Sequence, residues 1–250
     1  ENLTLLCFED QSDREHVSQM RRDFVANVSH ELKTPLTALL GFIETLNTSA
    51  RSDASARQRF LEIMEREAQR MNRLVSDLLS LSQVEAVERM RPNEEVDVSR
   101  LLHETATTLT PVAEARGVRL QVVNADRLVK MAGDRDQLRQ IFINLIENAI
   151  KYGGPNNEVS VTLSDTSYQT LLRCEGIAIS VVDKGPGIDA LDIPRLTERF
   201  YRIDSHRSRE MGGTGLGLAI VKHIVSRHRG VLKIYSAVGK GSEFKIILPV

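Results

Sequence analysis

The chain has 250 residues, of which 41% are hydrophobic, and its 33 basic and 34 acidic side chains leave a formal net charge of −1. This length suits one large domain or two modest ones. The balanced charge lacks the basic excess expected of proteins that bind nucleic acid or an anionic membrane. The cysteines, Cys7 and Cys174, form neither a disulfide framework nor a zinc-ligand spacing. We therefore predict a reducing compartment and buried, inert thiols.

The start of the chain indicates a fragment. No apolar run approaches the about 20 residues of a membrane-spanning helix, and the first residue is Glu1 rather than methionine. Residues 1–11 contain the apolar stretch LTLLCF, which we interpret as a remnant of an upstream sensor domain or linker. The alternative is a frayed terminus that packs on the helix after it.

Two long amphipathic helices are predicted next. Apolar residues recur at steps of three and four from Val17 to Leu46, which indicates a helix over residues 12–47. A polar turn and a second striped helix over residues 56–88 complete an antiparallel hairpin. Pairing two hairpins in a four-helix bundle would cover the apolar stripes, so we expect a homodimer. The alternative is a monomer whose stripe packs on its own second domain.

The periodicity changes after a polar linker at residues 89–95. Strands then alternate with helices, but not in strict βαβ order, which favours a mixed sheet covered by helices on one face. We place the first domain at residues 12–90 and the second at residues 91–250. The predicted helices cover residues 99–115, 135–152 and 216–228, and the predicted strands cover residues 118–123, 128–132, 159–163, 177–183, 232–236 and 244–248.

The first polar cluster of the second domain is Asn144, Asn148, Lys151 and Tyr152 on one predicted helix. A spacing of four residues puts both asparagines on the same helix face. A carboxamide oxygen can bind Mg²⁺, and a nearby ammonium group can balance phosphate charge. Two ordinary capping or core asparagines remain the alternative interpretation.

The second cluster, DKGPG, follows the apolar strand IAISVV. Asp183 at the strand end can accept a hydrogen bond from an exocyclic amine, while Gly185 and Gly187 permit close approach of a flat ligand. The alternative is a plain strand-to-loop turn.

The third cluster is GGTGLGLAI, from Gly212 to Ile220. Its glycines open a helix whose free N–H groups can hold phosphates. It matches neither the P-loop pattern nor a dinucleotide fingerprint. The basic, polar segment of residues 198–211 before it has the composition of a lid over a nucleotide; a solvated loop is the alternative.

In this order and spacing, the clusters resemble the N, G1, F and G2 boxes of the GHKL ATPases, and VSHELKTPL at residues 28–36 resembles the H box of HisKA-type histidine kinases. The resemblance implies a helical-hairpin dimerisation and phosphotransfer domain at residues 12–90. A catalytic α/β sandwich of the GHKL (Bergerat) type would follow at residues 91–250. Within the family, residues 24–46 and 196–230 and the stretch LLCFED are most similar to phosphate-regulon sensor kinases.

His30 is the expected phosphorylation site. It lies two positions, about 200° around a helix, from the core-facing Val28 and Leu32, so it should point to solvent. An exposed neutral imidazole with an adjacent acid suits a nucleophile, and we assign Glu31 as general base or hydrogen-bond acceptor. The resemblance also implies that Thr34 orients a water that hydrolyses the phosphorylated partner. The alternative is that Glu31 and Thr34 are ordinary residues of the helix surface.

The resemblance gives each remaining motif residue an expected role in binding ATP and Mg²⁺. Asn148 coordinates the metal and Asn144 supports it. Asp183 reads the adenine amine, and Gly185 and Gly187 shape that wall. Phosphates or sugar are contacted by Lys151, Tyr152 and Arg202, and the phosphates are lined by Gly213, Thr214, Gly215 and Gly217. Phe200 anchors the lid by packing.

These expectations describe the cytoplasmic portion of a bacterial kinase anchored in the inner membrane through segments outside this chain. It would phosphorylate His30 from ATP, pass the group to an aspartate of a response-regulator receiver domain, and dephosphorylate that regulator in phosphate-starvation signalling. Two rivals remain: a GHKL ATPase that hydrolyses ATP without modifying itself, and a dimeric scaffold that binds ATP only for regulation.

Overall fold

The computed structural model describes residues 12–48, 53–125, 128–154, 156–203 and 212–250, and side chains from residue 22 onward. The predicted upstream remnant, Cys7 and lid residues 204–211 lie outside these ranges. The chain forms two compact units, one ending at Arg73 and one running from Leu74 to Val250. Within the described residues, no helix combines the length and the apolar character that crossing a membrane requires.

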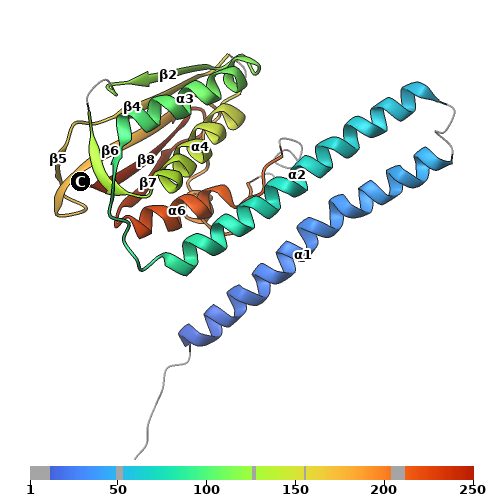
Figure 1. Ribbon diagram of the computed structural model, residues 1–250, viewed down its shortest axis with the longest axis horizontal. Coiled ribbons are helices and arrows are strands. Elements are labelled where there is room, and N and C mark those ends of the chain that lie inside the picture. The colour runs from blue at the N-terminus through green and yellow to red at the C-terminus, as the bar shows by residue number, and fades with distance from the viewer. Residues whose placement is uncertain (1–11, 49–52, 126–127, 155, 204–211) are drawn as a thin grey trace, which may run out of the picture. The chain divides into compact units, whose positions relative to one another are not determined.

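The predicted hairpin is present as α1 (Ser12–Asn47) and α2 (Ala54–Val87). The two helices run antiparallel (Figure 1). Before α2, the Asp53 carboxylate accepts a hydrogen bond from the Ala56 N–H at 2.9 Å, as an N-capping residue does. The rings of Phe42 and Phe60 pack across the hairpin with centroids 5.4 Å apart. Apolar residues of the two helices therefore pack against each other at this level of the hairpin.

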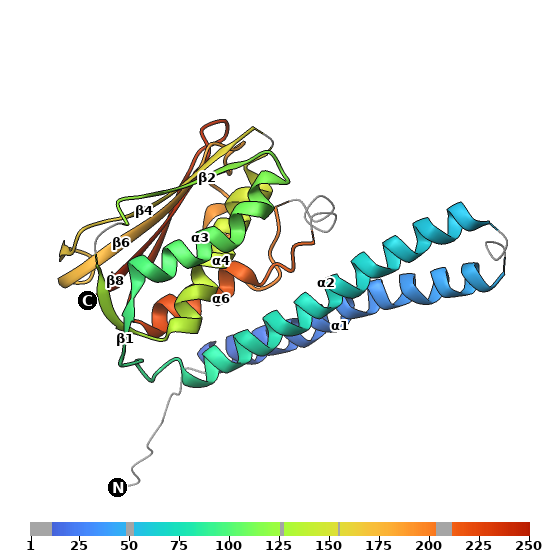
Figure 2. The same ribbon diagram turned by 45° about the horizontal axis from the view of Figure 1, so that its top comes forward.

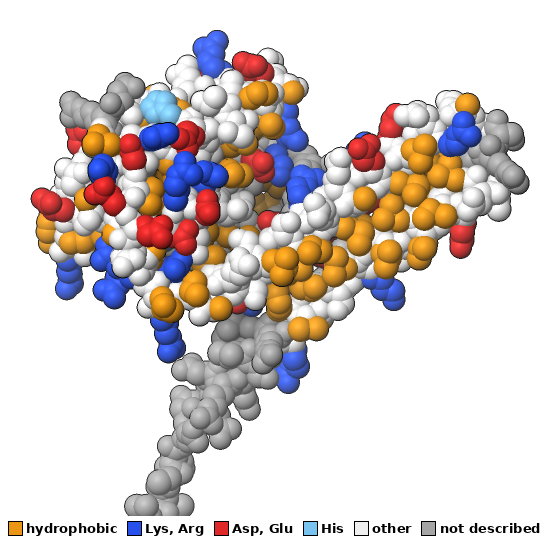
Figure 3. Space-filling view, viewed as in Figure 1, with side chains coloured by type: hydrophobic (Ala, Val, Ile, Leu, Met, Phe, Trp, Pro, Cys, Tyr) orange, Lys and Arg blue, Asp and Glu red, His pale blue; other side chains and the backbone are white. Residues whose placement is uncertain are grey.

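Each hairpin helix also keeps a second apolar line exposed. Large hydrophobic side chains gather along the hairpin in Figure 3. On each helix these residues lie at nearly the same angle around the helix axis, so they share one face. The exposed residues are Val25, Leu36, Leu40 and Ile43 on α1, and Leu61, Val75 and Leu79 on α2.

The second unit continues with strands and helices in an interleaved order. Its elements are β1 (Glu94–Asp97), α3 (Val98–Glu114), β2 (Arg119–Val123), β3 (Lys130–Gly133), α4 (Arg135–Tyr152), β4 (Glu158–Leu163), β5 (Ser167–Gln169), β6 (Cys174–Asp183), the short 3-10 helix η1 (Ile193–Arg195), α6 (Gly217–Arg227), β7 (Val231–Ser236) and β8 (Ser242–Pro249).

The main sheet has the strand order β2-β4-β6-β8-β7, with β5 added to β6. The β2–β4 pair is parallel and the other pairs are antiparallel. Helices α3, α4 and α6 lie on the same face of this sheet (Figures 1 and 2). The predicted mixed sheet with helices on one face is confirmed.

The core lies between that sheet face and the helices. Along β4, Val159, Val161 and Leu163 are fully buried at alternate positions, and Phe142 and Ile146 of α4 are equally inaccessible. Each such side chain contributes about 1.5–3 kcal/mol on burial. The strand period of two and the helix period of 3.6 thus meet in one apolar layer, which places α4 firmly against the sheet.

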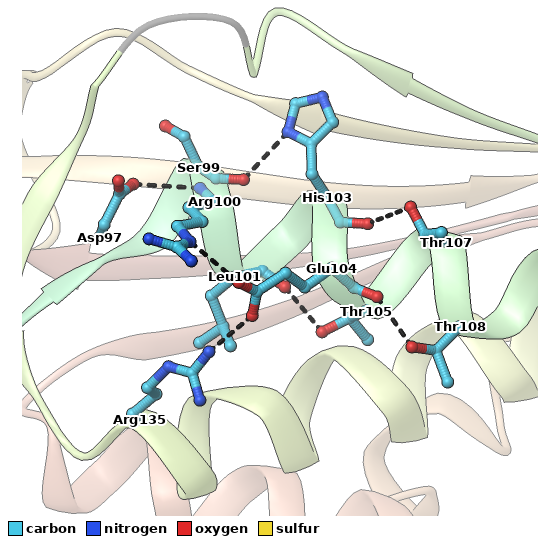
Figure 4. A network of polar contacts seen from close by, with 10 residues as sticks. All are labelled: Asp97, Ser99, Arg100, Leu101, His103, Glu104, Thr105, Thr107, Thr108 and Arg135. Atoms are coloured by element: carbon cyan, nitrogen blue, oxygen red, sulfur yellow. Dashed lines mark hydrogen bonds and ion pairs between the residues drawn. The ribbon is translucent and has the colours of Figure 1, made fainter.

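A polar network links the starts of α3 and α4 (Figure 4). Asp97 caps α3 by accepting from the Arg100 N–H at 3.0 Å. Glu104 accepts from Arg100 Nε at 2.9 Å and from Arg135 Nη2 at 2.5 Å. Because Arg135 is the first residue of α4, this carboxylate fixes the N-terminal end of α4 to α3.

Three features differ from the sequence prediction. The polar linker ends earlier, because Glu94–Asp97 pairs with β3 as β1. The short strand β5 was not predicted, because three residues are too few to show an alternation of apolar and polar side chains. Cys174 is exposed rather than buried, because it begins β6 where that strand pairs with the short edge strand β5.

Candidate active site

Helix α4 presents the predicted asparagine cluster beside its buried face. The Asp134 carboxylate caps α4, accepting from the Gln137 N–H at 3.1 Å. Asn144, Asn148 and Lys151 are half-buried, next to the fully buried Leu145 and Ile146. At the end of the helix, Tyr152 is 38% exposed. The two carboxamides therefore lie at the rim of the core, within reach of a ligand.

Asp183 ends β6 as a buried carboxylate, only 6% exposed. Burial raises the pKa of Asp183, and backbone N–H donors from Gly185 and Ser242 partly oppose that rise. The Gly185 N–H donates to the carboxylate at 2.8 Å. A buried carboxylate held in this way is a directional hydrogen-bond acceptor, as recognition of an exocyclic amine requires.

Two glycines of the DKGPG turn are required by close backbone contacts. Gly187 adopts φ +71°, and a Cβ there would lie 1.9 Å from the Ala237 carbonyl oxygen. A Cβ on Gly185 would lie 2.8 Å from Gly153 Cα, just past the end of α4. The turn therefore packs directly on the C-terminal end of the asparagine helix, as a shared binding wall needs.

The GGTGLGL segment ends at the start of α6 as predicted. The Phe200 N–H donates to the Gly215 carbonyl at 2.8 Å, and a Cβ on Gly215 would lie 2.8 Å from Phe200 Cα. Phe200 itself has φ +66°. The described start of the lid is thus anchored on the glycine loop through backbone contacts.

Helix α6 begins at Gly217 with no side-chain capping bond at Leu216. By contrast, α3 and α4 are capped by aspartates. An N-terminus without a capping side chain leaves its N–H groups to water or a ligand. Gly213 and Arg202 are half-buried near the two ends of the lid. The Thr214 hydroxyl donates to Asp77 Oδ2 at 2.6 Å, so in this structure it contacts α2.

The asparagine helix and the glycine loop meet at Asn144. A Cβ on Gly217 would lie 3.2 Å from Asn144 Oδ1. Among the described atoms, the buried Asn144 Nδ2 has no hydrogen-bond partner. The second and third clusters thus both contact α4, which carries the first. The Asn144 carboxamide oxygen lies at the start of α6, and an oxygen ligand beside backbone N–H donors suits a Mg²⁺–triphosphate.

The predicted nucleophile lies on α1. His30 is exposed, which confirms the orientation deduced from helix geometry. Thr34 is also exposed, and its hydroxyl donates to the His30 carbonyl at 3.1 Å. Glu31 differs, because its side chain is 12% exposed and pairs with Arg70 Nη2 at 2.9 Å. Adjacent residues therefore face different ways, with the imidazole toward solvent and the carboxylate toward α2.

One residue near these clusters carried no sequence signal. Asn157 is 7% exposed, and its side-chain oxygen accepts from the Lys184 N–H directly after Asp183. In the loop GPNNEV an asparagine is an ordinary turn residue, so only the structure reveals this contact.

A separate cavity of about 350 Å³, lined by residues that include Asp97, Arg100 and Arg135, contains none of the predicted site residues.

Comparison with known families assigns both regions. Residues 20–87 match the His Kinase A (phospho-acceptor) domain, and residues 133–250 match the histidine kinase-, DNA gyrase B- and HSP90-like ATPase family. The phosphate regulon sensor protein PhoR of Pseudomonas aeruginosa is 41% identical over 240 residues, which cover 96% of this chain and 52% of PhoR. The chain thus spans about half the length of that relative.

Two solved structures are similar to most of the chain. Full-length ShkA in complex with AMPPNP is 27% identical with a TM-score of 0.64, over 91% of this chain and 45% of ShkA. Histidine kinase ThkA in complex with the response regulator protein TrrA has a TM-score of 0.70 at 22% identity, over 96% of this chain and 65% of that one. The second likeness is evidence of the fold alone.

Proposed function

Because the chain belongs to the HisKA-type sensor histidine kinases, we propose that it phosphorylates His30 from ATP and passes the phosphoryl group to a response-regulator aspartate. One observation carries this proposal: two motif clusters from distant parts of the sequence contact α4, which carries a third, while the chain also presents an exposed histidine on a helical hairpin. Neither rival function needs both features.

The phosphoryl transfer requires a neutral imidazole. One ring nitrogen of His30 attacks the γ-phosphorus as the bond to the β–γ bridging oxygen breaks, and ADP leaves. Glu31 holds the proton on the other ring nitrogen. Since Arg70 binds the Glu31 carboxylate at 2.9 Å in this structure, that carboxylate must turn away from α2 to reach the imidazole. Arg70 therefore competes with His30 for the proposed base.

The second unit positions the nucleotide. Asp183 accepts from the adenine amine against the wall formed by Gly185 and Gly187, while Lys151, Tyr152 and Arg202 contact phosphates or sugar. Backbone N–H groups of the glycine loop, from Gly213 through Thr214 and Gly215 to Gly217, face the phosphates at the start of α6. Asn148, supported by Asn144, would hold Mg²⁺, which neutralises phosphate charge.

The hairpin supplies the remaining functions. The exposed apolar lines of α1 and α2 fit a second copy of the hairpin, which would give a homodimer with a four-helix bundle. A receiver domain would dock on the hairpin around His30. There Thr34, once released from the His30 carbonyl, would orient the water that dephosphorylates the regulator. Similarity to PhoR favours phosphate-starvation signalling as the pathway.

The test is labelling of the purified chain with γ-phosphate-labelled ATP. We expect an acid-labile, base-stable label that disappears in His30→Ala, while His30→Ala binds ATP as tightly as the wild type. Glu31→Gln should slow labelling about 10²-fold or more, as loss of a general base does. ATP hydrolysis without label would instead identify a GHKL ATPase, and label retained by His30→Ala would exclude the proposed nucleophile.

A further inference from the structure

Asn157 is a buried side chain between the end of α4 and the start of β4. Its Oδ1 accepts from the Glu158 N–H at 2.7 Å and from the Lys184 N–H at 3.0 Å. Because both partners are donors, the carbonyl oxygen must face them and the amide nitrogen must face the opposite way. The orientation of this carboxamide is therefore determined by its contacts.

The second of these bonds holds the turn that carries Asp183. Lys184 N–H belongs to the peptide bond directly after Asp183, and the next N–H, from Gly185, donates to the Asp183 carboxylate. Asn157 thus fixes the first peptide of the turn, and the second peptide fixes the carboxylate. A shift of the first peptide would move the acceptor atoms of Asp183.

The other side of the Asn157 carboxamide abuts the end of α4. A Cβ on Gly153 would lie 1.8 Å from Asn157 Nδ2, and a Cβ on Gly185 would lie 2.8 Å from Gly153 Cα. The carboxamide therefore fills the junction of the asparagine helix with the Asp183 turn. It sets the spacing between these two walls of the candidate nucleotide site.

Packing alone does not account for an asparagine at this junction. Among the described atoms, the buried Nδ2 has no hydrogen-bond partner, and a buried donor without a partner destabilises the folded state. The oxygen of the same group makes both useful bonds. The arrangement is costly for folding and favourable for holding the turn.

We propose that Asn157 is a positioning residue for adenine recognition, which aims the Asp183 carboxylate at the exocyclic amine through the Lys184 peptide. This inference rests on the proposed role of Asp183. Removing the Asn157 oxygen would let the turn shift, so selectivity for the amine would fall. Contacts to the phosphates, which come from other elements, would remain.

The test compares equilibrium dissociation constants of Mg²⁺–ATP and Mg²⁺–purine riboside triphosphate, which lacks the 6-amino group. A hydrogen bond to a charged acceptor should give the wild type a preference for ATP of about tenfold or more. In Asn157→Ala we expect this preference to fall below about threefold, with affinity for the analogue changed less than about threefold. Asn157→Ser serves as the second variant if the alanine protein does not fold.

Thr105→Ala is the matched control, because Thr105 is another buried polar residue of the second unit and its hydroxyl donates to the Leu101 carbonyl at 2.7 Å. It should lose stability but keep the wild-type preference. A preference retained by Asn157→Ala, or equal losses for both nucleotides, would overturn the inference alone. A wild type without any preference would overturn adenine reading by Asp183, and this inference with it.

Discussion

The helical hairpin and the sheet-containing part of the second unit present their chemistry in opposite ways. On the hairpin, His30 stands on an exposed face of a regular helix, and apolar lines on both helices remain exposed. In the second unit the core is closed, and at the candidate site glycines approach neighbouring backbone so closely that a Cβ would not fit. The hairpin site should therefore respond to association, whereas the nucleotide site should respond to small changes of backbone shape.

The sharpest test of this contrast is Gly187→Ala. The added Cβ would lie 1.9 Å from the Ala237 carbonyl oxygen, so the Asp183 turn must move. We expect the dissociation constant for ATP, measured by calorimetry, to rise about 100-fold or more, which corresponds to at least about 2.7 kcal/mol. Assembly through the hairpin should be unchanged.

Gly239→Ala provides the matched control. Gly239 has a similar positive φ of +78°, but nothing lies within 4 Å of an added Cβ. Gly239→Ala should lower the free energy of unfolding by only about 1 kcal/mol, the cost of placing alanine in the left-handed region. It should leave the affinity for ATP nearly unaltered. If both variants bind ATP equally well, close packing of the turn is not what shapes the site.

The second test addresses the exposed apolar lines. Leu40 on α1 and Leu171 near β5 are both 55% exposed, so Leu40→Glu and Leu171→Glu make equal changes in exposed charge. We expect Leu40→Glu to weaken dimerisation about tenfold or more, because burying an unpaired carboxylate costs several kcal/mol. Leu171→Glu should have no effect. Sedimentation equilibrium measures both, and equal behaviour would favour a monomer or another interface.

The smallest effect concerns the pH dependence of stability in the second unit. His228 is 1% exposed. One ring nitrogen, Nε2, accepts from the Asp134 N–H at 3.1 Å, and Nδ1 lies 2.8 Å from the Ile224 carbonyl. These partners match the neutral ring. Burial lowers the pKa of His228 below its usual value, with Arg227 and Arg91 adding to the shift while the Ile224 carbonyl and Asp134 oppose it.

A lowered pKa means that the unfolded chain binds more protons than the folded chain below about pH 6.5. The contribution of His228 to the free energy of unfolding is therefore fully present above that pH. On acidification below it, this contribution falls by up to about 1.4 kcal/mol per pH unit. Urea unfolding between pH 7 and pH 5 should show a shallower pH slope for His228→Gln than for the wild type. Equal slopes would mean that His228 is not the titrating group.

Local sequence patterns determined most of the helices and several site residues. The spacing of apolar residues predicted α1 over residues 12–47, the bounds found in the structure, and it also predicted the exposure of His30. Capping by Asp134 and the helix start near Gly217 followed from local chemistry as well. These features depend on neighbours within one or two turns, so a single stretch of sequence contains the whole cause.

Tertiary structure decided the contacts between residues far apart in the sequence. No local pattern in the sequence indicates the strand order β2-β4-β6-β8-β7 or the hydrogen bond from the Lys184 N–H to Asn157. The same is true of the backbone contact between Phe200 and Gly215 and of the ion pair between Glu31 and Arg70. Each depends on how separate elements pack. Periodicity tells which face of an element is apolar, but not which partner covers it or which side chain fills the junction.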